Sequence, residues 1–306
     1  MYRLSNYPFR MQPFSLLLLA LLLTACKQED KILSPNSSLE FGQPTKVEVK
    51  GYGGNIMEPF LSRDGNTLLF NNLNAAPENT NLHWATAIND STFQYRGEIA
   101  GVNTNDLEGV PTMDTAGNIY FVSTRNYATT LSTLFQGTFS QGAVANVRLL
   151  GGISKMQAGW VNFDVEVSAD GQMLYFVDAQ FDQTGTPATA DIVVATKNGD
   201  SFQRLANSST LMKNINTDAA LEYAACISVN QLELFFTRVS VPLSATSMPQ
   251  ILVSTRNNIS EPFGIPTKIQ TITGFAEAAT IAPDQRTLYF HKKEGGKFLL
   301  YKVIKK

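Results

Sequence analysis

The residues of this sequence with the clearest potential for chemistry are five acidic side chains that recur along the chain. Each stands at the start of a short apolar segment that precedes a turn, and the five are Glu58, Glu108, Asp164, Glu222 and Glu277. Carboxylates that gather in one place raise some of their own pKa values or recruit a cation. A converging ring of this kind predicts a site for a calcium ion, a basic side chain or a cluster of sugar hydroxyl groups.

Two other interpretations of the same acids remain open. Glycoside hydrolysis needs an acid and a base or nucleophile at a defined separation, and two members of the ring would supply that pair. Alternatively, each carboxylate accepts hydrogen bonds from a neighbouring unit and serves packing alone. The basic residues available as counter-charges are Arg63, Arg125, Arg238 and Lys292. Because the acids recur in every copy without one distinctive catalytic motif, we expect no catalysis from them, and the packing interpretation is favoured over the ligand site.

Other catalytic chemistries lack the residues that they need. The sequence has only two histidines, His83 and His291, and no histidine or cysteine spacing of the kind that binds zinc. It contains neither a G-x-S-x-G nucleophile motif nor a phosphate-binding G-x-x-x-x-G-K-[ST] loop. We therefore predict no metal and no cofactor.

Five copies of one hairpin must position these acids. The copies are SRDGNTLLF, TAGNIYF, SADGQMLYF, SVNQLELFF and APDQRTLYF, and they end at Phe70, Phe121, Phe176, Phe236 and Phe290. The intervals of 51, 55, 60 and 54 residues between these phenylalanines are typical of a propeller or a repeat array. Gly and Asn at the turns tolerate positive φ, and the apolar runs that follow predict buried strands.

The remaining segments of each copy predict the architecture. A third strand follows each hairpin and a fourth follows in the middle copies, which makes a four-stranded propeller blade. Near the start of the chain, FGQPTKVEV (41–49) matches FGIPTKIQT (263–271), the outer strand of the fourth unit, while the fifth unit stops after three strands. The sequence therefore predicts an all-β, five-bladed β-propeller over 41–306, closed by an N-terminal strand that completes the last blade. An open array is the alternative, and it would need capping ends.

These motifs resemble the TolB-type, WD-like Pro-Asp propeller repeats. The resemblance rests on the five hairpins and on the flanking VNTNDLEGVP (102–111) and INTDAALEYA (215–224), and it covers nearly all of 41–306. The second copy lacks the Asp before Gly117, and the last two copies have Gln where Gly is usual. The resemblance implies a propeller of the bacterial envelope, and because the family is functionally mixed it implies no activity. Arabinanase-like and fructosidase-like glycosidases are also five-bladed and use channel carboxylates.

The N-terminus carries the features of a targeting segment. Arg3 and Arg10 precede an apolar run at 14–23, and Leu23-Thr24-Ala25-Cys26 resembles the bacterial lipobox, in which the cysteine is acylated. A transmembrane anchor is the alternative, but the run is about half of the ~20 residues that a span needs. We predict a lipoprotein signal peptide at 1–25, lipidation of Cys26 and a flexible tether at 26–40. Lys27 after the cysteine suggests the outer membrane, with either its periplasmic face or the cell surface as the site of display.

Composition limits the partners. The net charge of −2 and the pI near 5.8 provide no basic field for nucleic acid. With Cys26 acylated, Cys226 has no cysteine to pair with. The sequence thus predicts an envelope lipoprotein, attached to the membrane through its lipid, whose propeller is a non-catalytic binding or scaffolding module for a protein or glycan partner. The alternative is a glycan-active hydrolase, and the oligomeric state is open.

Overall fold

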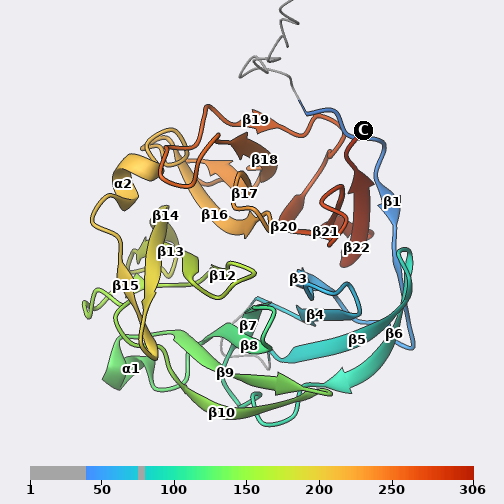
Figure 1. The fold of residues 1–306 in the computed structure, drawn as a ribbon, viewed down its shortest axis with the longest axis horizontal. Coiled ribbons are helices and arrows are strands. Elements are labelled where there is room, and N and C mark those ends of the chain that lie inside the picture. The colour runs from blue at the N-terminus through green and yellow to red at the C-terminus, as the bar shows by residue number, and fades with distance from the viewer. Residues whose placement is uncertain (1–38, 75–79) are drawn as a thin grey trace, which may run out of the picture. The chain divides into compact units, whose positions relative to one another are not determined.

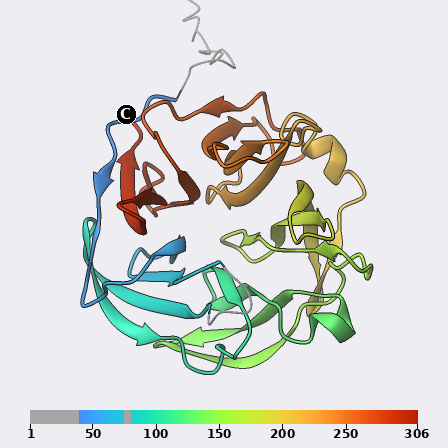
Figure 2. The same ribbon diagram turned by 180° about the vertical axis from the view of Figure 1, so that it is seen from behind.

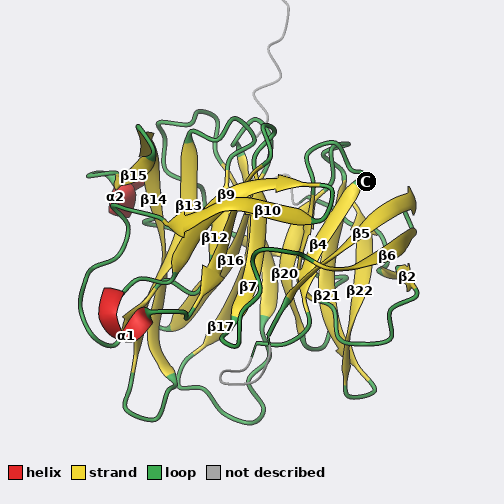
Figure 3. Ribbon diagram, turned by 90° about the horizontal axis from the view of Figure 1, so that it is seen from below, coloured by secondary structure: helices red, strands yellow, loops and turns green. Residues whose placement is uncertain are grey.

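Five β-sheets stand around a central axis in the computed structural model, which describes residues 39–74 and 80–306 (Figures 1 and 2). The fold is an all-β, five-bladed propeller, as the sequence predicts. The described helices are two single turns, α1 (Tyr127–Thr130) and α2 (Ser208–Leu211), both at the periphery (Figure 3). Neither is long enough to cross a membrane. The predicted signal peptide, Cys26 and the tether up to residue 38 lie outside the described residues.

Each blade is an antiparallel sheet whose strands run outward from the axis in chain order. Blade 1 contains β3 (Met57–Leu61), β4 (Thr67–Asn71), β5 (Leu82–Asn89) and β6 (Thr92–Glu98), and a parallel edge strand, β2 (Glu48–Lys50), pairs with β6. Blade 2 contains β7 (Glu108–Met113), β8 (Asn118–Ser123), β9 (Leu134–Ser140) and β10 (Ala143–Leu149). Blade 3 contains β12 (Val165–Val167), β13 (Met173–Phe181), β14 (Pro187–Asn198) and β15 (Ser201–Arg204), and β11 (Trp160–Val161) pairs with the far end of β13.

Blades 4 and 5 show how the ring closes. Blade 4 contains β16 (Ala220–Ile227), β17 (Glu233–Ser240), β18 (Gln250–Thr255) and β19 (Thr267–Lys268). Blade 5 contains β20 (Ala276–Ile281), β21 (Thr287–Glu294), β22 (Lys297–Ile304) and, as its outer strand, β1 (Thr45–Lys46).

The predicted seam is confirmed. Thr45 pairs with Lys302 in antiparallel register, and the Val47 N–H donates to the Leu300 carbonyl over 2.9 Å. The matching Thr267–Lys268 segment takes the same outer position on β18. Borrowing the first strand for the last blade covers the outer edge of β22, which would otherwise expose unpaired backbone groups.

The hairpin motif holds its own turn. In the first copy the Ser62 hydroxyl donates to Asp64, and Asp64 accepts the N–H of Asn66 over 3.0 Å. The same bonds recur at Ser168 and Asp170. These polar side chains therefore serve local turn geometry. The apolar run that follows each turn is the core: Leu68, Leu69 and Phe70 are fully buried.

A bulge interrupts four of the five innermost strands at one equivalent position. One inner-strand residue has positive φ in each of blades 1, 2, 4 and 5, and these residues are Glu58, Val110, Ala224 and Ala278. The pairing register shifts at each of them. Because a bulge frees its N–H from the ladder, each of these N–H groups donates to a side chain of the preceding blade: His291, Asn71, Asp164 and Thr237, respectively.

Candidate active site in the central channel

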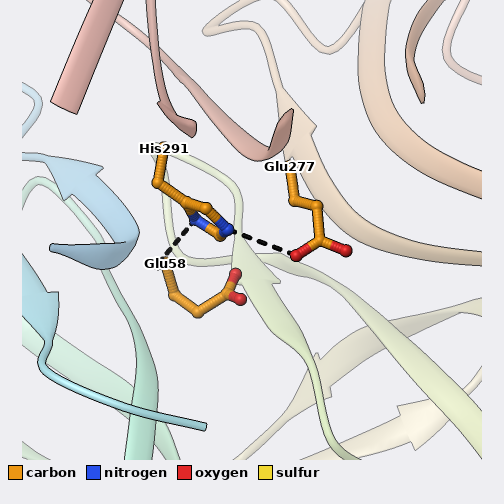
Figure 4. A group of neighbouring side chains, drawn as sticks. All are labelled: Glu58, Glu277 and His291. Atoms are coloured by element: carbon orange, nitrogen blue, oxygen red, sulfur yellow. Dashed lines mark hydrogen bonds and ion pairs between the residues drawn. The ribbon is translucent and has the colours of Figure 1, made fainter. Parts of the chain in front are cut away.

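Three of the five predicted acids approach one another where the inner strands begin. Glu58, Asp164 and Glu277 come from blades 1, 3 and 5, and all three are more than nine-tenths buried. Glu58 and Asp164 line a cavity of about 20 Å³ together with inner-strand residues of the other blades. That volume accommodates about one water molecule. One ligand atom from each of Glu58, Glu277 and His291 lies within 4.8 Å of the others (Figure 4).

Two of these acids are held in the neutral form. Burial, together with the neighbouring charges of Asp164 and Glu277, raises the pKa of Glu58 to about 8 against the opposing effects of His291 and Asn74. Burial also raises the pKa of Asp164 to about 8, although the N–H of Ala224 donates to this carboxyl over 2.9 Å. The two acids interact, so their titration belongs to the pair. Near neutral pH both are predominantly protonated.

Glu277 has the opposite environment. The Tyr223 hydroxyl donates to its Oε1, and the His291 ring nitrogen Nε2 lies 3.2 Å from its Oε2. The N–H of Glu58 donates to the other ring nitrogen, Nδ1, over 3.1 Å. Nδ1 must therefore be an acceptor, which places the ring proton on Nε2, where it is donated to Glu277. With a donor at each oxygen, Glu277 is arranged as a carboxylate.

The same tautomer bears on metal binding. Glu58, Glu277 and His291 each offer one atom to the cluster in Figure 4. A metal at Nε2 would require the proton to move to Nδ1, where the backbone N–H of Glu58 already points. Metal-bound histidines normally donate their second N–H to an acceptor, and here a donor occupies that place. The cluster is therefore arranged to hold protons rather than a metal ion.

His291 both accepts the N–H of Glu58 and faces Glu277, and two substitutions isolate the first of these roles. Asn71 holds the equivalent N–H of Val110 through its amide oxygen, so we expect His291→Asn to retain the inter-blade bond. His291→Leu leaves the buried Glu58 N–H without an acceptor, which should cost about 1–3 kcal/mol of stability relative to the Asn variant. Urea unfolding at pH 7 measures the difference. Equal stability of the two variants would refute this role.

The expectation that all five acids are equivalent is wrong. Glu58 and Asp164 lie four residues before their hairpins, Glu277 lies five before, Glu222 six before and Glu108 seven before. Along an inner strand, such offsets move a side chain to another depth or another face. Only three of the acids therefore converge.

Glu108 and Glu222 instead form hydrogen bonds and ion pairs within their own blades. Glu108 accepts hydrogen bonds from the N–H and hydroxyl of Thr104, both over 2.7 Å, and from Arg125 over 3.0 Å. Glu222 accepts the corresponding bonds from Thr217 and from Arg238, the latter over 2.8 Å. For these two acids the packing interpretation describes the geometry.

The basic residues are also engaged. Arg125 pairs with Glu108 and Arg238 pairs with Glu222, as just described. Arg63 reaches from blade 1 to blade 3, where its Nη2 lies 2.9 Å from Glu166 and 2.6 Å from the Val167 carbonyl oxygen. Lys292 lies over the ring of Tyr301. None of these four is an ion-pair partner of the three converging acids.

Sequence reasoning missed three residues of the channel: Glu166, Tyr223 and His291. A usable signal existed for His291. It directly follows the last phenylalanine of its hairpin, a position occupied by Asn71 and Thr237 in two other copies and by valine in the remaining two. Polar residues at a position that is otherwise apolar mark the inter-blade bonds.

Known proteins resemble this chain in structure but not in sequence. No protein-family model and no curated protein matches the sequence. A solved glycoside hydrolase is 10% identical, with a TM-score of 0.56 and coverage of 88% of this chain and 93% of that structure. The Cellvibrio cellulosa α-L-arabinanase is 12% identical, with a TM-score of 0.53 and coverage of 83% and 92%.

The predicted resemblance to TolB is supported only in part. TolB from Acinetobacter baumannii is a structural neighbour at 13% identity, with coverage of 83% of this chain and 55% of that one, but its TM-score is 0.44. The part of the prediction that holds is the five-bladed propeller fold, which the arrangement of the strands shows.

These neighbours also correct the functional prediction. The sequence favours a non-catalytic binding or scaffolding module, whereas the propellers with TM-scores above 0.5 reported above are glycan-cleaving enzymes. At 10–12% identity the likeness establishes the fold.

Proposed function

We propose that the propeller is a glycan-active hydrolase whose acid is Asp164 and whose base is Glu277. The observation that carries the proposal is a pair of buried carboxyl groups kept protonated beside a carboxylate that has a donor at each oxygen. Carboxyl groups whose environments set them in opposite protonation states are the requirement of glycosidic bond cleavage.

The separation between Glu58 and Glu277 argues against Glu58 as the acid of the pair. Glu58 and Glu277 place oxygens within 4.8 Å of each other, which is shorter than the roughly 6.5–9.5 Å needed to seat a water between an acid and a base. Asp164 comes from blade 3 and lines the water-sized cavity together with Glu58. Asp164 is therefore the proposed acid, and its burial, together with the neighbouring charge of Glu277, keeps it protonated.

The proposed reaction is a hydrolysis with inversion. Asp164 donates its proton to the oxygen of the leaving sugar as the glycosidic bond breaks. A water attacks the anomeric carbon from the other side and transfers its proton to Glu277. Tyr223 and His291 do not react, because their role is to orient the Glu277 carboxylate.

The size of the cavity places the glycan. Small-molecule sites usually measure about 300–1,000 Å³, whereas this cavity of about 20 Å³ admits a water but no sugar ring. The glycan must therefore lie across the channel end where the inner strands start, with only the scissile bond facing the acids.

Release of reducing ends from polysaccharides tests the proposal. The purified protein is expected to cleave at least one member of a panel that includes arabinan, galactan and xylan, with a rate that falls as the pH rises through about 8, because Asp164 then loses its proton. Absence of cleavage across the panel between pH 5 and 8 would contradict the proposal.

We also propose that the enzyme is anchored to the bacterial outer membrane through acylated Cys26. The support is the lipobox-like Leu23-Thr24-Ala25-Cys26 sequence. Radioactive palmitate is expected to label the wild-type chain in a bacterial host and to be lost in Cys26→Ala. An unlabelled wild-type chain would refute the anchor.

A further inference from the structure

Two pairs of phenylalanines remain partly exposed beside the carboxylate cluster. On blade 3, Phe163 and Phe181 meet edge to face with their ring centroids 6.0 Å apart. On blade 5, Phe275 and Phe298 meet in the same way at 5.7 Å. The phenylalanines that end the five hairpins are fully buried or nearly so. These four rings are therefore exceptions to the burial that the repeat otherwise imposes.

Each pair adjoins one of the two groups that hold Glu277. The Phe163 ring lies 5.9 Å from the ring of Tyr223, whose hydroxyl donates to Oε1 of Glu277. The Phe298 ring lies 5.3 Å from the ring of His291, whose Nε2 faces Oε2. The two pairs thus lie behind opposite oxygens of one carboxylate.

Their place along the strands puts them at the channel end proposed for the glycan. Phe163 directly precedes Asp164, and Phe275 precedes Glu277 by two residues, so both stand just before the inner strands begin. Phe181 ends β13 and Phe298 is near the start of β22, which are the ends of those strands that lie at the same side of their blades.

We propose that the Phe163–Phe181 and Phe275–Phe298 pairs are stacking subsites for sugar rings on either side of the scissile bond. The apolar C–H face of a pyranose or furanose packs on an aromatic ring, and a half-buried aromatic supplies a rigid surface at low entropic cost. The ligand is then an oligosaccharide of at least two rings rather than a single glycoside. The inference rests on the proposed function and specifies its substrate class.

Binding to an inactive enzyme tests the subsites separately from catalysis. In a Glu277→Gln background, calorimetry with arabinohexaose, galactohexaose and xylohexaose is expected to identify a ligand. Phe163→Leu and Phe298→Leu retain most of the apolar volume but remove the ring face. Each should lower the affinity for that ligand about tenfold. Phe139→Leu is the matched control, because Phe139 is also half-buried and packs edge to face, on Trp84 of another blade.

The outcomes separate the two proposals. Unchanged affinity in both Leu variants, with cleavage by the wild type, overturns the subsites and leaves the hydrolase. Weakened affinity in the Leu variants, without cleavage by the wild type, supports the subsites and overturns the hydrolase. Failure of all three hexaoses to bind, or an equal loss in Phe139→Leu, also overturns the subsites.

Discussion

Replacing Asp164 with Asn is expected to lower kcat on a cleaved glycan by about 10²–10⁴-fold, the usual contribution of a positioned acid. The amide keeps the shape of the side chain and can still accept the Ala224 N–H through its oxygen, so the fold should persist. It has no proton to give the leaving oxygen. Because the change removes an interaction made only in the transition state, kcat and kcat/KM should fall together.

Two further variants make this result specific. Glu277→Gln should cause a loss of similar size, because the amide cannot take the proton of the attacking water. Glu261→Gln, an exposed acid on blade 4, should leave turnover unchanged. A kcat within a few-fold of wild type in Asp164→Asn would remove Asp164 from the mechanism.

Stability is expected to fall as the pH rises from about 5 to about 8. Glu58 and Asp164 have ordinary pKa values of 4.5 and 3.8 in the unfolded chain and values of about 8 when folded. Between those limits the folded state binds protons that the unfolded state has lost, so each pH unit removes up to about 1.4 kcal/mol of stability per group. Below the pKa values of the unfolded chain the two acids contribute their full stabilisation, and above about pH 8 that stabilisation is lost.

The double variant Glu58→Gln, Asp164→Asn isolates this effect from other titrating groups. Its free energy of unfolding, relative to wild type, should rise by several kcal/mol between pH 5 and pH 8.5. The reason is that neutral amides stay uncharged, whereas ionisation of the wild-type acids in a buried channel is unfavourable. Urea titrations at the two pH values measure it. A difference that does not change with pH would show that the acids titrate normally.

Much of the fold follows from the sequence because repeats constrain it strongly. Five hairpins that end in buried phenylalanines predict five blades, and the match between 41–49 and 263–271 predicts which strand closes the ring. Both features depend on local patterns that every copy must satisfy. The parallel pairing of β2 with β6 has no counterpart in the repeat and could not be read from it.

The site follows from the sequence far less well, because the residues that matter depart from the repeat. Glu58, Glu108 and Glu277 each open an inner-strand segment, yet their distances in sequence from the hairpin differ. Bulges at Glu58 and Ala278 then change which way the inner strand faces. Tyr223 and His291 come from other strands, and only the closed ring brings them to Glu277.

The central claim is that the channel holds neutral acids beside a fixed carboxylate, and ¹³C NMR titration of the side-chain carboxyl groups tests it most directly. The signals of Asp164 and Glu58 are identified by their loss in Asp164→Asn and Glu58→Gln, respectively. Both signals should titrate with apparent pKa values of about 8. Titration of both signals near pH 4 would contradict the account.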